Sequence, residues 1–146
     1  RSVSRGLGDV YKRQGIDRDN DLAVLKLVEK TINISPIQRK RKIEDINIGE
    51  TVYAIGNPQG LGQSVSMGII SAIGRKFINK EGSFIQTDAS INPGNSGGAL
   101  VDSNGNLLGV INFIESTTGG NQGLNFAIPI DVVSESYSKI LKEIKR

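Results

Sequence analysis

Short apolar runs, each closed by a turn that contains glycine, asparagine or proline, recur through most of this 146-residue chain. Apolar runs of this length between turn residues are typical of β-strands. The 18 glycines favour a fold with many turns over a helical bundle. We therefore predict an all-β domain, a small antiparallel barrel or a sandwich, with strands near 22–27, 51–56, 64–74, 84–87, 98–101, 107–114 and 124–128.

The last part of the sequence changes its period. Apolar residues there recur at the spacing of one helical face, at Val133, Tyr137, Ile140, Leu141 and Ile144. Asp131 follows Pro129 closely and is a good N-cap candidate. The sequence thus predicts one closing helix after the strands.

Charge and composition exclude several functions. The net charge is +3, and a basic run at 39–42 supplies part of it. No aromatic interleaving or known motif accompanies that run, so we expect a solvated loop and no nucleic-acid partner. No apolar stretch approaches the roughly 18 residues of a membrane span. The chain has no cysteine and no histidine, and we expect no metal site and no cofactor.

The run Asn92-Pro93-Gly94-Asn95-Ser96-Gly97-Gly98 places one serine in a tight turn before an apolar strand. Glycines allow positive φ, and such a turn can aim several backbone N–H groups at one point, as an oxyanion hole requires. The same residues also make ordinary β-turns. These seven residues alone leave both interpretations open.

Five segments in order resemble the protease domain of the Do-type (high-temperature-requirement) serine endopeptidases, from about Gly15 to the end. They are Asp21-Leu-Ala-Val-Leu-Lys26, Ala54-Ile-Gly-Asn-Pro-Gln-Gly60, Gln86-Thr-Asp-Ala89, the 92–98 run and Asn125-Phe-Ala-Ile-Pro129. The resemblance implies the trypsin-like double β-barrel. It also implies the end of the first barrel and a linker at 15–48, and the second barrel with its closing helix at 49–146.

The resemblance also implies residue roles. Ser96 is the nucleophile, Asp21 matches the triad acid, and the backbone N–H groups of Gly94, Asn95 and Ser96 form the oxyanion hole. The triad also needs a histidine, which the family places before the aspartate and which this sequence lacks. We therefore expect the chain as it stands to be inactive.

Residues 1–14 show neither strand nor helix periodicity, begin with Arg1, and are expected to be a non-native or disordered leader. Two explanations then compete for the missing histidine. One is a protease that has lost most of its first barrel, and the other is a non-catalytic peptide-binding pseudoprotease or adaptor. The leader favours the first.

The specificity pocket implied by the resemblance involves Ser90, Ile91, Leu124, Asn125 and Phe126. Ser90 occupies the position where trypsin-type enzymes carry an acid, so we predict small or medium apolar side chains at the cut site. Family membership further implies unfolded or misfolded protein substrates, a homotrimer, C-terminal PDZ domains outside this sequence, and the bacterial periplasm.

Overall fold

A computed structural model describes residues 11–28, 34–57, 62–77, 80–112 and 124–145. Within these residues the chain forms eight strands, one α-helix and two short 3-10 turns, η1 (Ile43–Asp45) and η3 (Pro93–Asn95). The strands and helix are β1 (Tyr11–Asp17), β2 (Leu22–Leu27), β3 (Thr51–Gly56), β4 (Ser64–Phe77), β5 (Lys80–Thr87), β6 (Ala99–Asp102), β7 (Leu107–Asn112), β8 (Asn125–Pro129) and α1 (Ile130–Ile144).

Six of the strands close into an antiparallel barrel. Their order is β3-β4-β5-β8-β7-β6, and β6 pairs with β3 to complete the circle. Along β3, Val52 and Ala54 point into the barrel and are fully buried, whereas Thr51, on the outer side of the strand, is exposed. This alternation follows from the two-residue period of a strand. The predicted barrel is confirmed.

Aliphatic side chains from every barrel strand fill the interior. Closure leaves no unpaired sheet edge, so the apolar faces of all six strands meet in one core. The core consists of Ile46, Val52, Ala54, Ile70, Ile85, Ala89, Ile91, Leu100, Leu108, Ile111 and Ala127.

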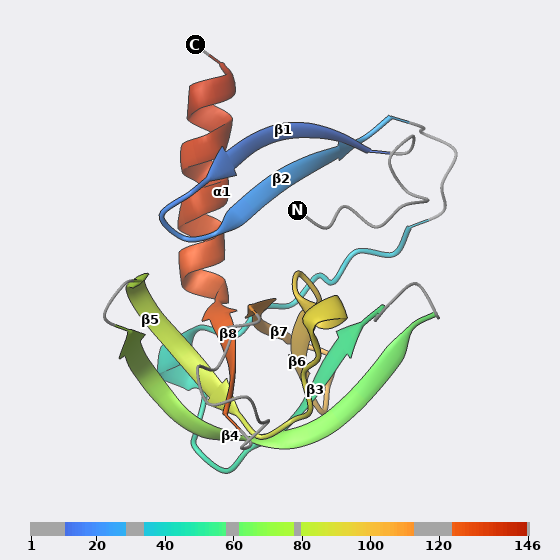
Figure 1. The fold of residues 1–146 in the computed structure, drawn as a ribbon, viewed down its shortest axis with the longest axis vertical. Helices are drawn as coiled ribbons and strands as arrows, with labels where there is room; N and C mark the ends of the chain where they lie inside the picture. Colours follow the sequence, from blue (N-terminus) through green and yellow to red (C-terminus); the bar gives the residue numbers. More distant parts are fainter. Residues whose placement is uncertain (1–10, 29–33, 58–61, 78–79, 113–123, 146) are drawn as a thin grey trace.

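The other two strands, β1 and β2, form a separate two-stranded sheet that lies across α1 (Figure 1). Such a hairpin is marginally stable alone and needs a packing partner. The partner is α1, where Ile140 packs directly over the backbone of Gly15. Strand β1 was not predicted, and its residues 11–14 belong to the segment expected to be a leader; residues 1–10 lie outside the described part.

The closing helix is confirmed, but its start differs from the expectation. The N-cap is Pro129, which offers no side-chain cap, and Asp131 lies inside the first turn. Ile140 is buried, while Tyr137 and Ile144 on the same apolar face are exposed. No helix in the described part of the chain combines the length and apolar character needed to cross a bilayer.

The basic run at 39–42 is not simply a solvated loop. Arg41 bonds both carboxylate oxygens of Glu50, at 2.6 and 3.0 Å, and one oxygen of Asp102 at 3.2 Å. Its backbone N–H also donates to Leu107 O on β7. Arg41 therefore attaches the segment between the hairpin and the barrel to the barrel wall.

Candidate active site

The turn before β6 presents Ser96 at the surface. Pro93–Asn95 form the 3-10 turn η3, closed by a hydrogen bond from Asn95 N to Asn92 O at 2.9 Å. Gly97 follows with φ +87°, a left-handed conformation that glycine adopts without steric cost. The Ser96 side chain is exposed. The sequence-predicted nucleophile therefore lies at the tip of a tight turn.

Strand β7 holds this turn in place. The Gly97 N–H donates to Ile111 O, and the Ile111 N–H donates to Gly98 O, both at 2.8 Å. Ile111 is itself buried in the barrel core. The position of the Ser96 turn is therefore set by the barrel.

The side chain of Asn95 lies beneath the turn. Asn95 is buried, and its Oδ1 has no hydrogen-bond partner within the described residues. The backbone N–H of Asn95, one of the three predicted oxyanion donors, is engaged with Asn92 O. To stabilise an oxyanion it would have to leave that bond.

The turn between β1 and β2 carries Asp21, the predicted triad acid. Asp21 has φ +56°, the one positive φ at a non-glycine residue in the described part. It is exposed at the surface, and its Oδ2 accepts a long hydrogen bond of 3.4 Å from Asn112 Nδ2. Asn112 is the last residue of β7 and is buried.

Sequence reasoning did not identify Asn112, because the residues that it joins are 91 positions apart. Its signal in the sequence is slight: a polar residue ends an otherwise apolar strand. The structure thus connects Asp21 and the Ser96 turn to consecutive residues of β7, Asn112 and Ile111.

The predicted specificity residues come from two neighbouring segments. Ser90 and Leu124 are exposed, Ile91 and Asn125 are buried, and Phe126 is half-buried. Asn125 Nδ2 donates to Ala89 O at 2.9 Å and so joins the two segments directly. The nearby Asp88 carboxylate accepts from the Ile69 N–H at 2.7 Å. Asp88 is the acidic residue nearest to Ser90 in the sequence, and this bond holds its carboxylate against β4.

Two charge clusters lie outside the predicted site. In the first, Arg41 lowers the pKa of Glu50 to about 2 through its hydrogen bonds, and Glu50 in turn raises the pKa of Arg41. Burial raises the pKa of Asp102, but hydrogen bonds from Asn106, Asn104 and Arg41 outweigh it, so that this pKa is lowered. The second cluster surrounds Asp17, whose pKa is lowered to about 2, chiefly by the Asn20 side chain.

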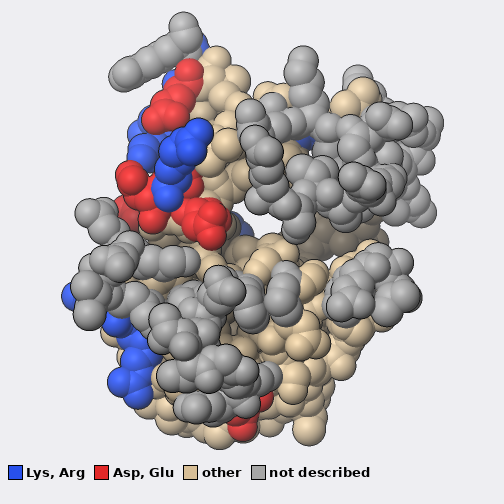
Figure 2. Space-filling model, in the orientation of Figure 1, with Lys and Arg blue, Asp and Glu red and all other residues tan. Residues whose placement is uncertain are grey.

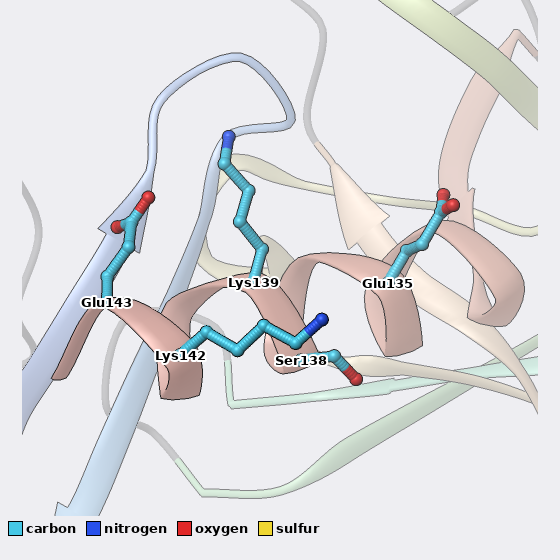
Figure 3. Close-up of a pocket in the computed structure, with 5 residues that line it drawn as sticks. All are labelled: Glu135, Ser138, Lys139, Lys142 and Glu143. Atoms are coloured by element: carbon cyan, nitrogen blue, oxygen red, sulfur yellow. The ribbon is translucent and has the colours of Figure 1, made fainter. Parts of the chain in front are cut away.

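A shallow pocket on the outer face of α1 contains none of the predicted site residues. Figure 3 shows its lining, Glu135, Ser138, Lys139, Lys142 and Glu143, all from one helix. Acidic and basic side chains interleave along this helix in Figure 2. This pattern is that of a solvated helix face, so the pocket adds nothing to the site.

Residues 3–110 match the model of the family described as "Trypsin-like peptidase domain"; the match begins within the segment 1–14. Serine endoprotease DegS of Haemophilus influenzae is 44% identical over 143 residues, covering 93% of this chain and 41% of that protein. Periplasmic serine endoprotease DegP of Escherichia coli K12 is 42% identical over 139 residues, covering 92% and 29% respectively. The chain therefore spans less than half the length of these relatives.

Solved structures agree with this relationship. The HtrA-type protease AlgW, solved with a decapeptide, is 48% identical and superposes with a TM-score of 0.80 over 90% of this chain and 40% of that one. The same protease with a tripeptide is 47% identical, with a TM-score of 0.80 over 91% and 44%. At these identities the likeness extends beyond the fold to the sequence.

Proposed function

Because this chain belongs to the trypsin-like peptidases, with Do-type serine endoproteases among its relatives, we propose that its site is that of a serine endopeptidase. Ser96 is the nucleophile, and Asp21 is the acid that orients the catalytic base. The backbone N–H groups of Gly94 and Ser96 form the oxyanion hole, together with that of Asn95 once it leaves its bond to Asn92 O. This assignment extends the family relationship to individual residues.

The observation that carries the proposal is the convergence of two distant turns on the end of β7. The backbone of Ile111 bonds the residues directly after Ser96, and the side chain of Asn112 bonds Asp21. A serine and an aspartate that cooperate through one imidazole must be held within reach of the same small volume. Attachment to one short strand supports that arrangement.

The mechanism requires a base that these 146 residues do not contain. A serine hydroxyl is a weak nucleophile until an imidazole accepts its proton, and the chain has no histidine. In subtilisin the loss of the triad histidine lowers kcat by about 10⁶-fold. We therefore propose that the chain as given does not turn over substrate.

The substrate proposal is an extended polypeptide with a small or medium apolar side chain at the cut site. Ser90, where trypsin-type enzymes carry an acid, supports this choice, as does the bond that holds Asp88 on β4. Extended substrates pair with a protease as an added strand. For the whole protein we propose unfolded protein substrates, a periplasmic location, as in the relatives named periplasmic, a homotrimer and PDZ domains.

Fluorophosphonate labelling and casein cleavage test the function. The protein at the full length encoded by its gene should be labelled at Ser96 and should cleave denatured casein, and Ser96→Ala should abolish both. The 146-residue chain, assayed in parallel, should show neither at a comparable rate. A full-length protein that binds casein without cleaving it, and that the probe does not label, would refute the assignment of Ser96.

A further inference from the structure

The proposed acid lies on a turn whose backbone is unfavourable. Asp21 has φ +56°, and a left-handed conformation at a residue with a side chain costs about 1 kcal/mol or more. Within the described residues, the Asp21 side chain has one hydrogen bond, a long one from Asn112. A turn of this kind persists only if neighbouring residues determine its shape.

Asp17, the last residue of β1, determines that shape. Its Oδ1 accepts from the backbone N–H groups of Asp19 at 3.1 Å and Asn20 at 3.3 Å, and its Oδ2 accepts from Asn20 Nδ2 at 2.8 Å. Both carboxylate oxygens are thus used inside the turn that ends at Asp21. Asp17 is also buried, at 3% exposure, in contrast to the exposed Asp19 and Asp21.

The same residue places the turn against α1. The buried Ser136 on α1 helps to lower the pKa of the Asp17 carboxylate, although its hydroxyl makes no hydrogen bond of normal geometry with any residue that the structure describes. Lys139, one turn further along α1, extends toward the β1–β2 turn in Figure 3, and its charge helps to lower the pKa of Asp17. Its 3.9 Å pairing with Asp19 Oδ2 joins two exposed side chains and contributes little. Behind them, Ile140 packs on the Gly15 backbone.

We propose that Asp17 is a positioning residue: it fixes the turn against α1 so that the Asp21 carboxylate stays opposite Asn112 at the end of β7. The inference rests on the proposed function, because it matters for catalysis only if Asp21 is the triad acid. The hydrogen bonds of Asp17 are those of a carboxylate cap over the turn, and the ionised form is the one that accepts at both oxygens.

The NMR signal of the Asn112 side-chain amide provides the readout. This amide donates to Asp21 and is not itself bonded to Asp17, so a change at Asp17 can reach it only through the position of Asp21. In ¹H–¹⁵N NMR spectra of the 146-residue chain, the Asn112 side-chain signal is assigned by its loss in Asn112→Leu. Asp21→Asn then gives the position of that signal without the carboxylate partner. Asp17→Ala should move the signal by at least half of the same displacement in the folded protein.

Asp19→Asn is the matched control, since it removes the same charge from the same turn. Asp19 is exposed and has a distant pairing with Lys139, so the Asn112 signal should stay at its wild-type position. Asp17→Asn keeps one acceptor for the two backbone donors but opposes the Asn20 amide with a second amide. It should give an intermediate shift, and it replaces Asp17→Ala if that variant does not fold.

An unchanged Asn112 signal in folded Asp17→Ala or Asp17→Asn overturns the proposal, even if the melting temperature falls, because Asp17 would then contribute to stability alone. This outcome is separate from the labelling of Ser96. A shifted signal together with an unreactive Ser96 in the full-length protein would leave the positioning contact intact and refute the endopeptidase assignment instead.

Discussion

The backbone of Gly56, at the end of β3, lies directly against the buried side chain of Asn95. A Cβ atom at Gly56 would be 2.5 Å from Asn95 Oδ1 and 2.9 Å from its Cγ. Real Cβ atoms do not approach other atoms so closely, so the Asn95 side chain can occupy this place only because residue 56 is a glycine. The Ser96 turn therefore depends on a residue 40 positions earlier in the chain.

Gly56→Ala should displace the Asn95 side chain and with it η3. We expect a loss of about 1–3 kcal/mol in the free energy of unfolding, measured by urea titration. Thr51→Ala, exposed on the same strand, should change it by less than about 0.5 kcal/mol. Adding Asn95→Ala to Gly56→Ala should recover part of the loss, because the opposing amide is gone. Strictly additive losses would contradict the contact.

The Arg41–Glu50 pair should give the chain an acid-dependent stability. The pKa of Glu50 is about 2 in the folded chain, below its ordinary value of 4.5. A carboxyl group whose pKa falls on folding contributes stability that is complete above the unfolded pKa and is lost as the pH falls toward the folded pKa. Wild type should therefore lose stability between pH 4.5 and 2, and Asp17, with a pKa of about 2, adds to this loss below its ordinary 3.8.

Glu50→Gln should cost about 1–2 kcal/mol at pH 7 and show a shallower decline below pH 4.5. The measurement is urea unfolding at pH 7, 4 and 3. Glu143→Gln, which removes an exposed carboxylate from α1, should keep the wild-type profile. If Glu50→Gln and wild type declined in parallel, the Arg41 pair would not be a source of the acid sensitivity.

Ile140→Ala should separate the β1–β2 hairpin from α1. Ile140 is 1% exposed and packs on Gly15, so its truncation leaves a cavity and should cost about 2–4 kcal/mol. Ile144→Ala on the same helix, at 43% exposure, should cost less than about 1 kcal/mol. Amide hydrogen exchange should speed up in β1 and β2 before the barrel strands. Equal acceleration throughout would show that the hairpin and the barrel open as one unit.

Asp131 distinguishes two kinds of helix-terminal stabilisation. An N-cap aspartate can be replaced by asparagine without loss, because both side chains accept from the first backbone N–H groups. A first-turn aspartate acts through its charge, so Asp131→Asn should cost about 0.3–1 kcal/mol at low salt and less at high salt. A variant as stable as wild type in thermal melts at low salt would restore the N-cap interpretation.

The strands were predictable wherever an apolar run is bounded by turn residues. Turn residues mark the ends of runs such as Leu22–Leu27 and Thr51–Gly56, and the strands in the structure have these same bounds. Strand β1 was missed because its outer half, Tyr11-Lys12-Arg13-Gln14, has no apolar alternation, and its pairing with β2 decides its conformation. The first residues of β5 were missed for the same reason: their partner is the end of β4.

The residues at the candidate site were predictable as types but not as contacts. Ser96 and Asp21 stand out through their local motifs. The bonds that Asn112 and Arg41 make join residues 91 and 61 positions apart, and no local pattern encodes them. Arg41 in particular has the same sequence context as its exposed neighbours. Only closure of the barrel brings Asp102 and Glu50 close enough together for Arg41 to bond both.

The packing of Gly15 on Ile140 has a consequence for synthesis on the ribosome. The hairpin is synthesised long before the helix that covers it, so during most of translation Gly15 lacks its contact with Ile140. Ile16 in β1 and Leu25 in β2 are exposed apolar residues even in the docked hairpin. A nascent chain in this state offers free strand edges and apolar surface to chaperones and to other nascent chains. The hairpin that presents Asp21 is therefore among the last parts of the molecule to reach its final place.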